Sequence, residues 1–278
     1  MREELELNRR HWDEATAIHT RGNVYGVEDF KAGQCRLHRL EVEEVGDVRD
    51  KRLLHLQCHF GIDTLSWARR GASVTGVDFS NDAIAYARQL SAETGVDGDF
   101  VCSNIYDVRS VLDAPGAFDI VFTSYGALNW LPDVKAWGEI VAHYLKPGGF
   151  FYIVEAHPTA RMFPIEEDMP RAGSFRPFFP YFHDPKGIRF GAGADYADAE
   201  ARHTIDEHEW QHTLGDIVSA LTTQGLRIDF LREFPFCAWQ VVAGCTEVVE
   251  KFSDNHCYFA RPGEPQLPLM FSLKATKA

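Results

Sequence analysis

A short loop and an acidic residue further along the chain together predict a nucleoside-binding site. Residues 57–61 (QCHFG) follow the apolar run at residues 53–56, and Asp78 follows the β-branched run at residues 73–77. In an open parallel sheet, a tight turn after the first strand lets a cofactor approach the backbone. The next helix then points its N-terminus at the ligand's polar end. A carboxylate at the tip of the second strand, about 20 residues on, can accept both hydroxyls of a ribose. This spacing fits NAD and S-adenosylmethionine equally well.

A second group of residues could remove a proton from a substrate. Glu155 and His157 lie at the tip of a predicted strand over residues 150–155. Because side chains two residues apart in a strand point to the same face, we expect both to lie on one side of the sheet. His212 follows a long insertion and could approach the same place. A histidine of near-neutral pKa suits general-base catalysis on a hydroxyl, thiol or ammonium group. The alternative of ordinary structural side chains stays open, and because no ligand spacing specifies a metal site, we predict none.

The elements that must position these residues alternate between strands and helices. We predict strands at residues 53–56, 73–77, 99–103, 118–123 and 150–155, with helices at 63–70, 81–90 and 133–145. Such alternation is typical of a parallel sheet with helices on both faces. A sheet of this kind binds ligands outside the carboxyl ends of its strands.

A different composition begins after residue 158. Residues 159–207 are rich in Pro, Gly and aromatic residues, including the run at 175–182. A segment of this length without periodicity is typical of a functional lid, and its aromatic content argues against disorder. We therefore expect the lid aromatics Phe178, Phe179, Tyr181 and Phe182 to line an acceptor pocket. A helix at 214–224, a strand at 226–231 and a last apolar stretch at 267–273 resume the fold.

We predict a single domain over residues 1–278 with four parts. These are an N-terminal helical cap at 1–50, a cofactor-binding core at 51–158, a lid and acceptor insertion at 159–212, and the completion of the sheet at 213–278.

Over roughly residues 45–158 the chain resembles the class I S-adenosylmethionine-dependent methyltransferases. The stretches that carry the resemblance, in the family's order, are residues 53–61, Asp78, residues 104–105, residues 118–125 and the Pro-Gly-Gly turn at 147–149. The resemblance implies a Rossmann-like seven-stranded, mostly parallel sheet, with residues 267–273 as its antiparallel last strand. It also implies methyl transfer from S-adenosylmethionine to a small-molecule acceptor.

The resemblance also implies roles for individual residues. Asp78 would hold the ribose, Phe79 would flank the adenine, and Asn104 and Ile105 would contact the edge and face of the adenine. The cofactor-binding residues expected in this way are Gln57, His59, Gly61, Asp63, Asp78, Phe79, Asn104, Ile105 and Ser124. The expected catalytic residues are Tyr125, Glu155, His157 and His212. Tyr125 and Trp130 follow the fourth strand, where cofactor and acceptor meet in this family, although both could be core aromatics.

The chain departs from the family pattern in the first loop. His55, Gln57 and His59 stand where the family commonly has Asp, Gly and Gly. The loss of glycine restricts a loop that needs positive φ. His59 and Asp63 would lie at the methionine end of the cofactor, or would be a packed loop histidine and a first-turn acid. The region of His11, Trp12 and Tyr25 often folds over the cofactor in this family, whereas we expect His203 and His208 to be solvated.

The composition of the chain argues against several classes of binding partner. The net charge of -13 repels phosphate backbones, which argues against a nucleic-acid substrate. No window approaches the roughly 18 apolar residues that span a membrane, and the charged N-terminus does not resemble a signal peptide. The six cysteines form no C-x-x-C pair, which suits a reducing cytoplasm. We therefore expect a cytoplasmic protein that acts on a small molecule, with its oligomeric state undetermined.

Three alternatives stay open. An NAD-dependent oxidoreductase would share the ribose acid, but it predicts a complete G-x-G-x-x-G, which is absent. A non-catalytic S-adenosylmethionine-binding protein and an S-adenosylmethionine-consuming cyclase would keep the cofactor site. Nothing in the sequence decides between O-, N-, S- and C-methylation.

Overall fold

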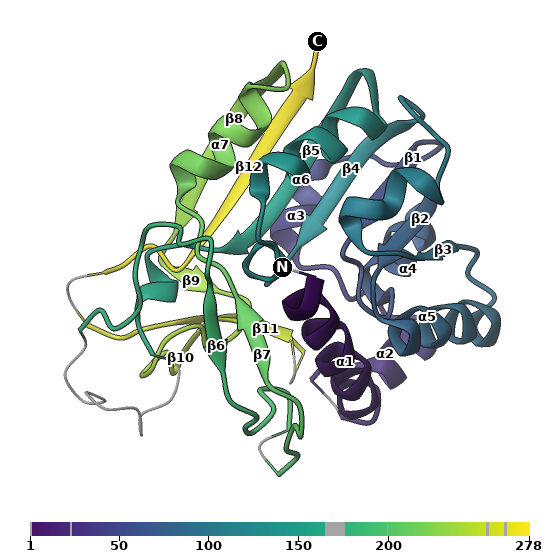
Figure 1. Ribbon diagram of the computed structural model, residues 1–278. Coiled ribbons are helices and arrows are strands. Elements are labelled where there is room, and N and C mark those ends of the chain that lie inside the picture. Colours follow the sequence, from purple (N-terminus) through teal and green to yellow (C-terminus); the bar gives the residue numbers. More distant parts are fainter. Residues whose placement is uncertain (1, 23, 165–175, 199, 254–255, 264–265) are drawn as a thin grey trace.

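The protein is built on one seven-stranded sheet (Figure 1). The computed structural model describes residues 2–22, 24–164, 176–198, 200–253, 256–263 and 266–278. The strands lie in the order β3-β2-β1-β4-β5-β12-β8. They are β1 (Arg52–Leu56), β2 (Ser73–Asp78), β3 (Asp99–Cys102), β4 (Phe118–Ser124), β5 (Leu145–Ala156), β8 (Leu226–Phe234) and β12 (Met270–Lys277).

The directions of the strands confirm the predicted fold class. β1 to β5 pair in parallel, whereas β12 is antiparallel to both β5 and β8. The central strands are buried on both faces, which explains why β1 and β4 read as continuous apolar runs rather than alternating ones. Several bounds differ from those expected, since β5 already begins at Leu145, β8 continues to Phe234, and the last strand runs from Met270 to Lys277.

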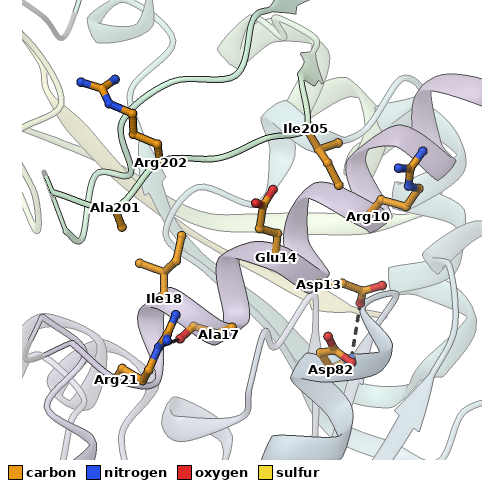
Figure 2. Close-up of a pocket in the computed structure, with 10 residues that line it drawn as sticks. All are labelled: Arg10, Asp13, Glu14, Ala17, Ile18, Arg21, Asp82, Ala201, Arg202 and Ile205. Atoms are coloured by element: carbon orange, nitrogen blue, oxygen red, sulfur yellow. Dashed lines mark hydrogen bonds between the residues drawn. The ribbon is translucent and has the colours of Figure 1, made fainter.

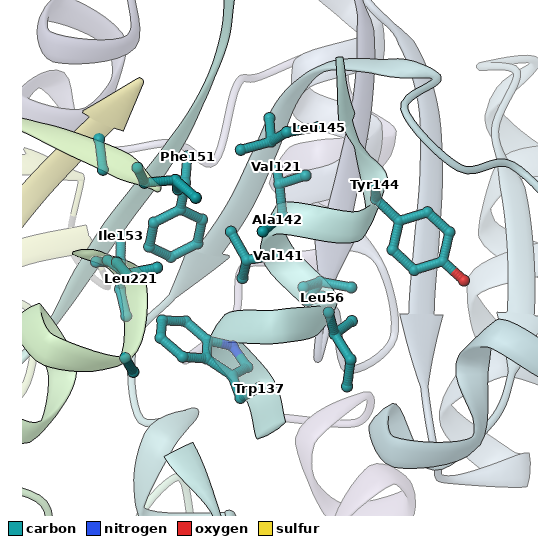
Figure 3. Packing of buried hydrophobic residues seen from close by; sticks show 14 of the residues in the cluster. Leu56, Val121, Trp137, Val141, Ala142, Tyr144, Leu145, Phe151, Ile153 and Leu221 are labelled. Carbon is teal, nitrogen blue, oxygen red and sulfur yellow. The ribbon is translucent and has the colours of Figure 1, made fainter. Parts of the chain in front are cut away.

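Helices cover both faces of the sheet (Figure 1). On one face α6 (Val134–Tyr144) packs on β4 and β5, and α7 (Leu214–Thr222) packs on α6 and β8. Figure 3 shows Trp137 of α6 beside Ile153 and Leu221, and all three side chains are buried. α6 begins at a capping bond from the Ala136 amide to Asp133. This core fixes the spacing of the carboxyl ends of β4 and β5.

The opposite face is covered by α3 (Arg39–Val45) and α4 (Ile62–Arg69), while α5 (Asn81–Thr94) packs beside β3. The buried rings of Trp67, Phe122 and Tyr152 lie at the centre of the core on this side. The N-terminal region is helical as expected, with α1 (Arg2–His19) and α2 (Val27–Lys31) preceding α3. No helix in the described ranges is long and apolar enough to cross a membrane.

Several small elements were not expected from the sequence. The long insertion carries a hairpin of β6 (Ile188–Phe190) and β7 (Glu207–Glu209), and a three-stranded sheet joins β9 (Phe236–Cys237), β11 (His256–Ala260) and β10 (Glu247–Ser253). Short 3-10 helices follow β3, β4 and β5 as η1 (Ile105–Ser110), η2 (Leu128–Trp130) and η3 (Ala160–Met162). These three turns carry the chain away from the carboxyl edge of the sheet.

Of the four aromatics expected at the acceptor pocket, Phe179 and Tyr181 are half-buried and the other two are exposed. Phe182 is 75% exposed and Phe178 is 41% exposed, so neither lines an enclosed pocket. Phe175 lies outside the described residues. The proposed division of the chain into a cap, core, insertion and completing segment stays a prediction.

Candidate functional site

The loop after β1 has an unusual backbone conformation. Gln57 has φ 61°, His59 has φ 51° and Gly61 has φ 76°. The positive φ expected of this loop is therefore present, although two of the three residues carry side chains. An L residue in the left-handed region costs roughly 1–2 kcal/mol. Gly61 is also required for space, because a Cβ there would lie 2.5 Å from the ring of Phe100.

Asp78 ties this loop to the tip of β2. Its Oδ2 accepts a hydrogen bond from the His59 amide at 2.8 Å, and its Oδ1 accepts one from the Ser80 amide at 3.0 Å. The residue is only 8% exposed, and this burial raises the pKa of Asp78 to about 6. The structure thus places the expected ribose acid against the expected loop.

Unpaired polar atoms cluster around the loop. Within the described ranges, Gln57 Oε1, His59 Nδ1 and Trp12 Nε1 are buried and have no hydrogen-bond partner. The Trp12 ring meets the His59 ring edge-on at 5.0 Å. A buried polar group without a partner costs about 1–3 kcal/mol. Three such groups around one loop fit a polar ligand that supplies the missing hydrogen bonds, as the sugar and amino-acid ends of S-adenosylmethionine would.

The residues expected at the adenine follow β2 and β3 directly. Phe79 is half-buried beside Asp78, and Ile105 is buried at the start of η1. Asn104 accepts the Tyr106 amide with its Oδ1 at 3.0 Å and so caps η1. This cap uses only the side-chain oxygen of Asn104. The side-chain amide nitrogen is therefore still available for the expected contact with the adenine.

Asp63 lies on the other side of the loop, in the first turn of α4. Burial raises the pKa of Asp63 to about 6, against the hydrogen bond from Ser124 and the positive charge of Arg36. Ser124 Oγ lies 3.4 Å from Asp63 Oδ2 and also 3.4 Å from His55 Nε2. This group of acid, hydroxyl and cation suits the amino-acid end of the cofactor.

Sequence reasoning missed Arg36. Its guanidinium is buried and lies 3.2 Å from Asp29. It packs over Gly26, where a Cβ would lie 2.4 Å from the guanidinium carbon. A buried arginine in the N-terminal cap has no motif that would mark it, because its neighbours are brought together only by the fold.

Tyr125 lies just beyond β4 and is held by a buried acid. Its hydroxyl donates to Glu41 Oε2, and Tyr125 itself has φ 47°. Glu41 is fully buried, and burial raises the pKa of its carboxyl well above the ordinary value. Glu41 lies in α3 and was not expected at the site.

The other three expected catalytic residues each engage a different partner. Glu155 accepts the backbone amides of residues 126, 127, 128 and 156 with its two oxygens. His157 Nε2 lies 2.9 Å from Glu233, and His212 Nε2 lies 2.6 Å from the Leu131 carbonyl. No hydrogen bond joins Glu155, His157 and His212 to one another among the described residues, and their catalytic roles stay predictions. In the described part of the chain, no group of three potential ligands could hold a metal ion.

A histidine and aspartate network lies above the loop instead. His19 of α1 bonds His59 Nε2 at 2.9 Å and Asp195 Oδ2 at 3.0 Å. His203 also bonds Asp195, at 2.7 Å. Burial raises the pKa of Asp195, but the hydrogen bonds to the two histidines outweigh it and hold that pKa well below its usual range. His203 and His208 are each 9% exposed, so the expectation that they are solvated is wrong.

The open pocket on the outer side of α1 is a separate feature (Figure 2). It lies between α1, the start of α5 and residues 201–205. Figure 2 shows the Asp13 carboxylate bonded to the amide of Asp82, and both residues line the pocket. Asp13 also accepts the Ser80 hydroxyl at 2.7 Å, which anchors α1 next to Asp78. None of the expected site residues lines this pocket.

The sheet order, the loop and the acid at the tip of β2 form the arrangement that the resemblance to the class I S-adenosylmethionine-dependent methyltransferases implied. Residues 53–149 match the family model of the methyltransferase domain. This match confirms the resemblance seen in the sequence over residues 53–149.

Curated proteins resemble part of the chain. It is 30% identical over 122 residues to a ubiquinone biosynthesis O-methyltransferase of Chromobacterium violaceum, which covers 44% of this chain and 51% of that protein. A homologue of the same name from Pseudomonas aeruginosa is 32% identical over 126 residues, covering 45% of this chain and 53% of the homologue. The chain thus spans about half the length of these curated relatives.

Solved structures show the same fold over most of the chain. An S-adenosylmethionine dependent methyltransferase from Mesorhizobium loti superposes with a TM-score of 0.55 at 21% identity, covering 89% of this chain and 100% of that one. A geranyl diphosphate C-methyltransferase from Streptomyces coelicolor superposes with a TM-score of 0.52 at 11% identity, covering 86% of this chain and 77% of that one.

Proposed function

We propose that the protein is an enzyme that transfers a methyl group from S-adenosylmethionine to a small-molecule acceptor. The observation that carries the proposal is the set of unpaired buried polar atoms around a loop that Asp78 fixes in place. The matching family model over residues 53–149 supports it.

Each part of the site has its own task. The cofactor, when bound, supplies a methyl group on a positively charged sulfur. Asp78 orients the ribose, and Phe79 with Asn104 and Ile105 encloses the adenine. Asp63, with Arg36 beside it, receives the amino-acid end. Orientation of this kind lowers the barrier because the reacting atoms are already aligned.

The segments above the sheet exclude water from the site. α1 and the segment around Asp195 are joined to the cofactor loop through His19, whose side chain is fully buried. Gln57 Nε2 donates to the Ala127 carbonyl at 2.7 Å, which fixes the loop against the turn after β4. Exclusion of water strengthens the electrostatic interactions inside the site and prevents side reactions.

The proposed acceptor is a small molecule rather than a nucleic acid. The net charge of -13 disfavours a phosphate backbone. The relatives include O-methyltransferases, and the structural neighbours include a C-methyltransferase and a glycopeptide N-methyltransferase, so their names leave the attacking atom open. A cytoplasmic location stays a prediction from the cysteine pattern.

Calorimetric titration tests the cofactor assignment. We expect the protein to bind S-adenosylhomocysteine and not NADH, and we expect Asp78→Ala to lose most of this affinity while Asp97→Ala, at an exposed site, keeps it. Binding of NADH alone would refute the proposal. Release of methylthioadenosine in place of S-adenosylhomocysteine during turnover would replace methyl transfer by another displacement. Tight binding without turnover on a broad acceptor panel would indicate a binding protein.

A further inference from the structure

A cluster of charged and aromatic side chains lies where the chain leaves β4 and β5. Trp130 ends η2 after β4, and Arg161 lies in η3 after β5. Glu207 and Glu209 come from β7 of the insertion, and His11 comes from α1. Four separate segments thus meet beyond the carboxyl ends of the two strands, on the side where an acceptor must approach.

Building on the proposed function, we propose that this cluster binds the methyl acceptor as an amine, with Glu207 holding the ammonium form and Trp130 contacting it through its ring face. The inference assigns a substrate class to the site and goes beyond the transfer reaction itself.

The charges of the cluster leave Glu207 without a full counter-ion. Arg161 is ion-paired with Glu209, whose other oxygen accepts from Asn129 Nδ2 at 2.6 Å. Glu207 has an ion-pair contact only with His11, at 3.2 Å, among the described residues. Burial, followed by repulsion from Glu209, raises the pKa of Glu207 to about 7. A ligand cation would relieve this unbalanced negative charge.

A proton that reaches the Glu207 carboxylate can be held between Glu207 and His11. His11 Nδ1 lies 3.0 Å from the Ile205 carbonyl, which can only accept, so Nδ1 carries a hydrogen. In neutral His11 the Nε2 atom is then an acceptor that faces Glu207 Oε2. One shared proton between these two atoms satisfies both. The pair is therefore built to take up a proton that arrives at Glu207.

With Glu207 as the proton acceptor, the ammonium group of the substrate can be converted to the amine that attacks the methyl group. The ammonium group of the acceptor gives one proton to the ionised Glu207 carboxylate, where His11 Nε2 accepts a hydrogen bond from it. The free amine lone pair then attacks the methyl carbon and forms the nitrogen–carbon bond. The carbon–sulfur bond breaks and its electron pair stays on sulfur, so the product leaves as a methylated ammonium ion.

Aromatic rings connect the cluster to the cofactor loop. Trp12 meets Trp130 edge-on at 5.2 Å and meets the His59 ring at 5.0 Å. His11 stacks on Trp130 at 6.0 Å. A cation over a tryptophan face gains about 0.5–2 kcal/mol, the larger values applying when it is desolvated. The Glu207 side chain keeps 28% exposure, so a ligand can reach the carboxylate.

A cation and its neutral isostere test the inference directly. Choline and 3,3-dimethylbutan-1-ol have the same shape and differ in charge. We would titrate each into the protein saturated with S-adenosylhomocysteine and follow tryptophan fluorescence. We expect choline to bind at least about 10-fold more tightly than the alcohol, and Glu207→Gln to reduce this preference several-fold, leaving the part that the Trp130 ring contributes. Asp206→Asn removes the same charge one residue away, at a carboxylate paired with exposed Arg189, and should keep the preference.

A turnover assay gives a second readout. We expect methylation of phenethylamine and none of 2-phenylethanol, with Glu207→Gln raising KM for the amine. Equal binding of the two isosteres, an unchanged preference in Glu207→Gln, or methylation of the alcohol alone would overturn the inference. Affinity for S-adenosylhomocysteine, measured on the same samples, separates the two proposals. If that affinity is present and the cation preference is absent, the amine assignment fails and the methyltransferase assignment stands.

Discussion

Replacement of Asp78 by Asn should change stability in a way that depends on pH. Burial raises the pKa of Asp78 from 3.8 to about 6. A shift of about 2 units corresponds to about 3 kcal/mol at 1.36 kcal/mol per unit. Because the folded pKa lies above the unfolded one, the stabilisation from protonated Asp78 is complete below pH 3.8 and is lost as the pH rises through 6. Asn does not titrate, so the Asp78→Asn variant does not lose this stability as the pH rises.

A second effect has the opposite sign and does not vary with pH. The two Asp78 oxygens accept one backbone amide each, from His59 and from Ser80. Asn offers one oxygen, so one amide faces an NH₂ group at a cost of about 1–3 kcal/mol. Asp78→Asn should therefore be the less stable protein at pH 4. Between pH 4 and pH 7, the free energy of unfolding of Asp78→Asn should rise by about 2–3 kcal/mol relative to that of the wild type.

Urea unfolding of the cofactor-free protein, followed by tryptophan fluorescence at several pH values, measures this difference. Asp97→Asn is the matched control, because Asp97 is exposed and its replacement should give a difference that is flat with pH. A flat difference for Asp78→Asn as well would refute the assignment of Asp78 as a buried, charged ligand group.

Two further substitutions test the loop after β1 and the segments that cover it, which are α1 and the segment around Asp195. Gly61→Ala should cost about 2–4 kcal/mol, from the left-handed backbone and the contact with Phe100, whereas Gly95→Ala, at φ 65° with no atom within 4 Å, should cost about 1 kcal/mol; equal costs in chemical unfolding would contradict the packing argument. His19→Phe removes buried hydrogen bonds to His59 and to Asp195, and it should weaken binding of S-adenosylhomocysteine and speed proteolysis of the insertion. Unchanged affinity and unchanged cleavage rates would show that His19 does not hold the cover in place.

The central sheet could be predicted because its signals are local. β1 to β4 lie within two residues of the expected bounds, since each is an apolar or β-branched run between turn residues. Asp78 was predicted as a site residue for the same reason, because the tip of a strand fixes which edge of the sheet it occupies. The strands β9 to β11 were missed, since β9 has only two residues and gives no periodic signal.

Contacts between distant segments could not be predicted. Asp195 and His19 are 176 residues apart, and their bond depends on how the insertion folds over α1. The position of Glu155 was predicted, but the four backbone amides that it accepts were not. A sequence pattern shows that a carboxylate lies at a strand tip, but it does not show whether its oxygens are free for catalysis. The same limit applies to Arg36 and Glu41, which no motif marks.

The loop after β1 shows why the loss of glycine does not imply the loss of a cofactor site. In the described part of the chain, four residues other than glycine have positive φ, and Gln57, His59 and Tyr125 are three of them. Each of the three is held by a side-chain bond, to the Ala127 carbonyl, to a histidine of α1 and to Glu41, respectively. A bond of this kind contributes about 1 kcal/mol, similar to the cost of the left-handed backbone. Glycine would adopt the same φ without strain, but it would leave the loop detached from the turn after β4 and from α1. These side chains therefore stabilise the backbone shape that glycine permits, and they also connect the cofactor loop to the segments that cover it.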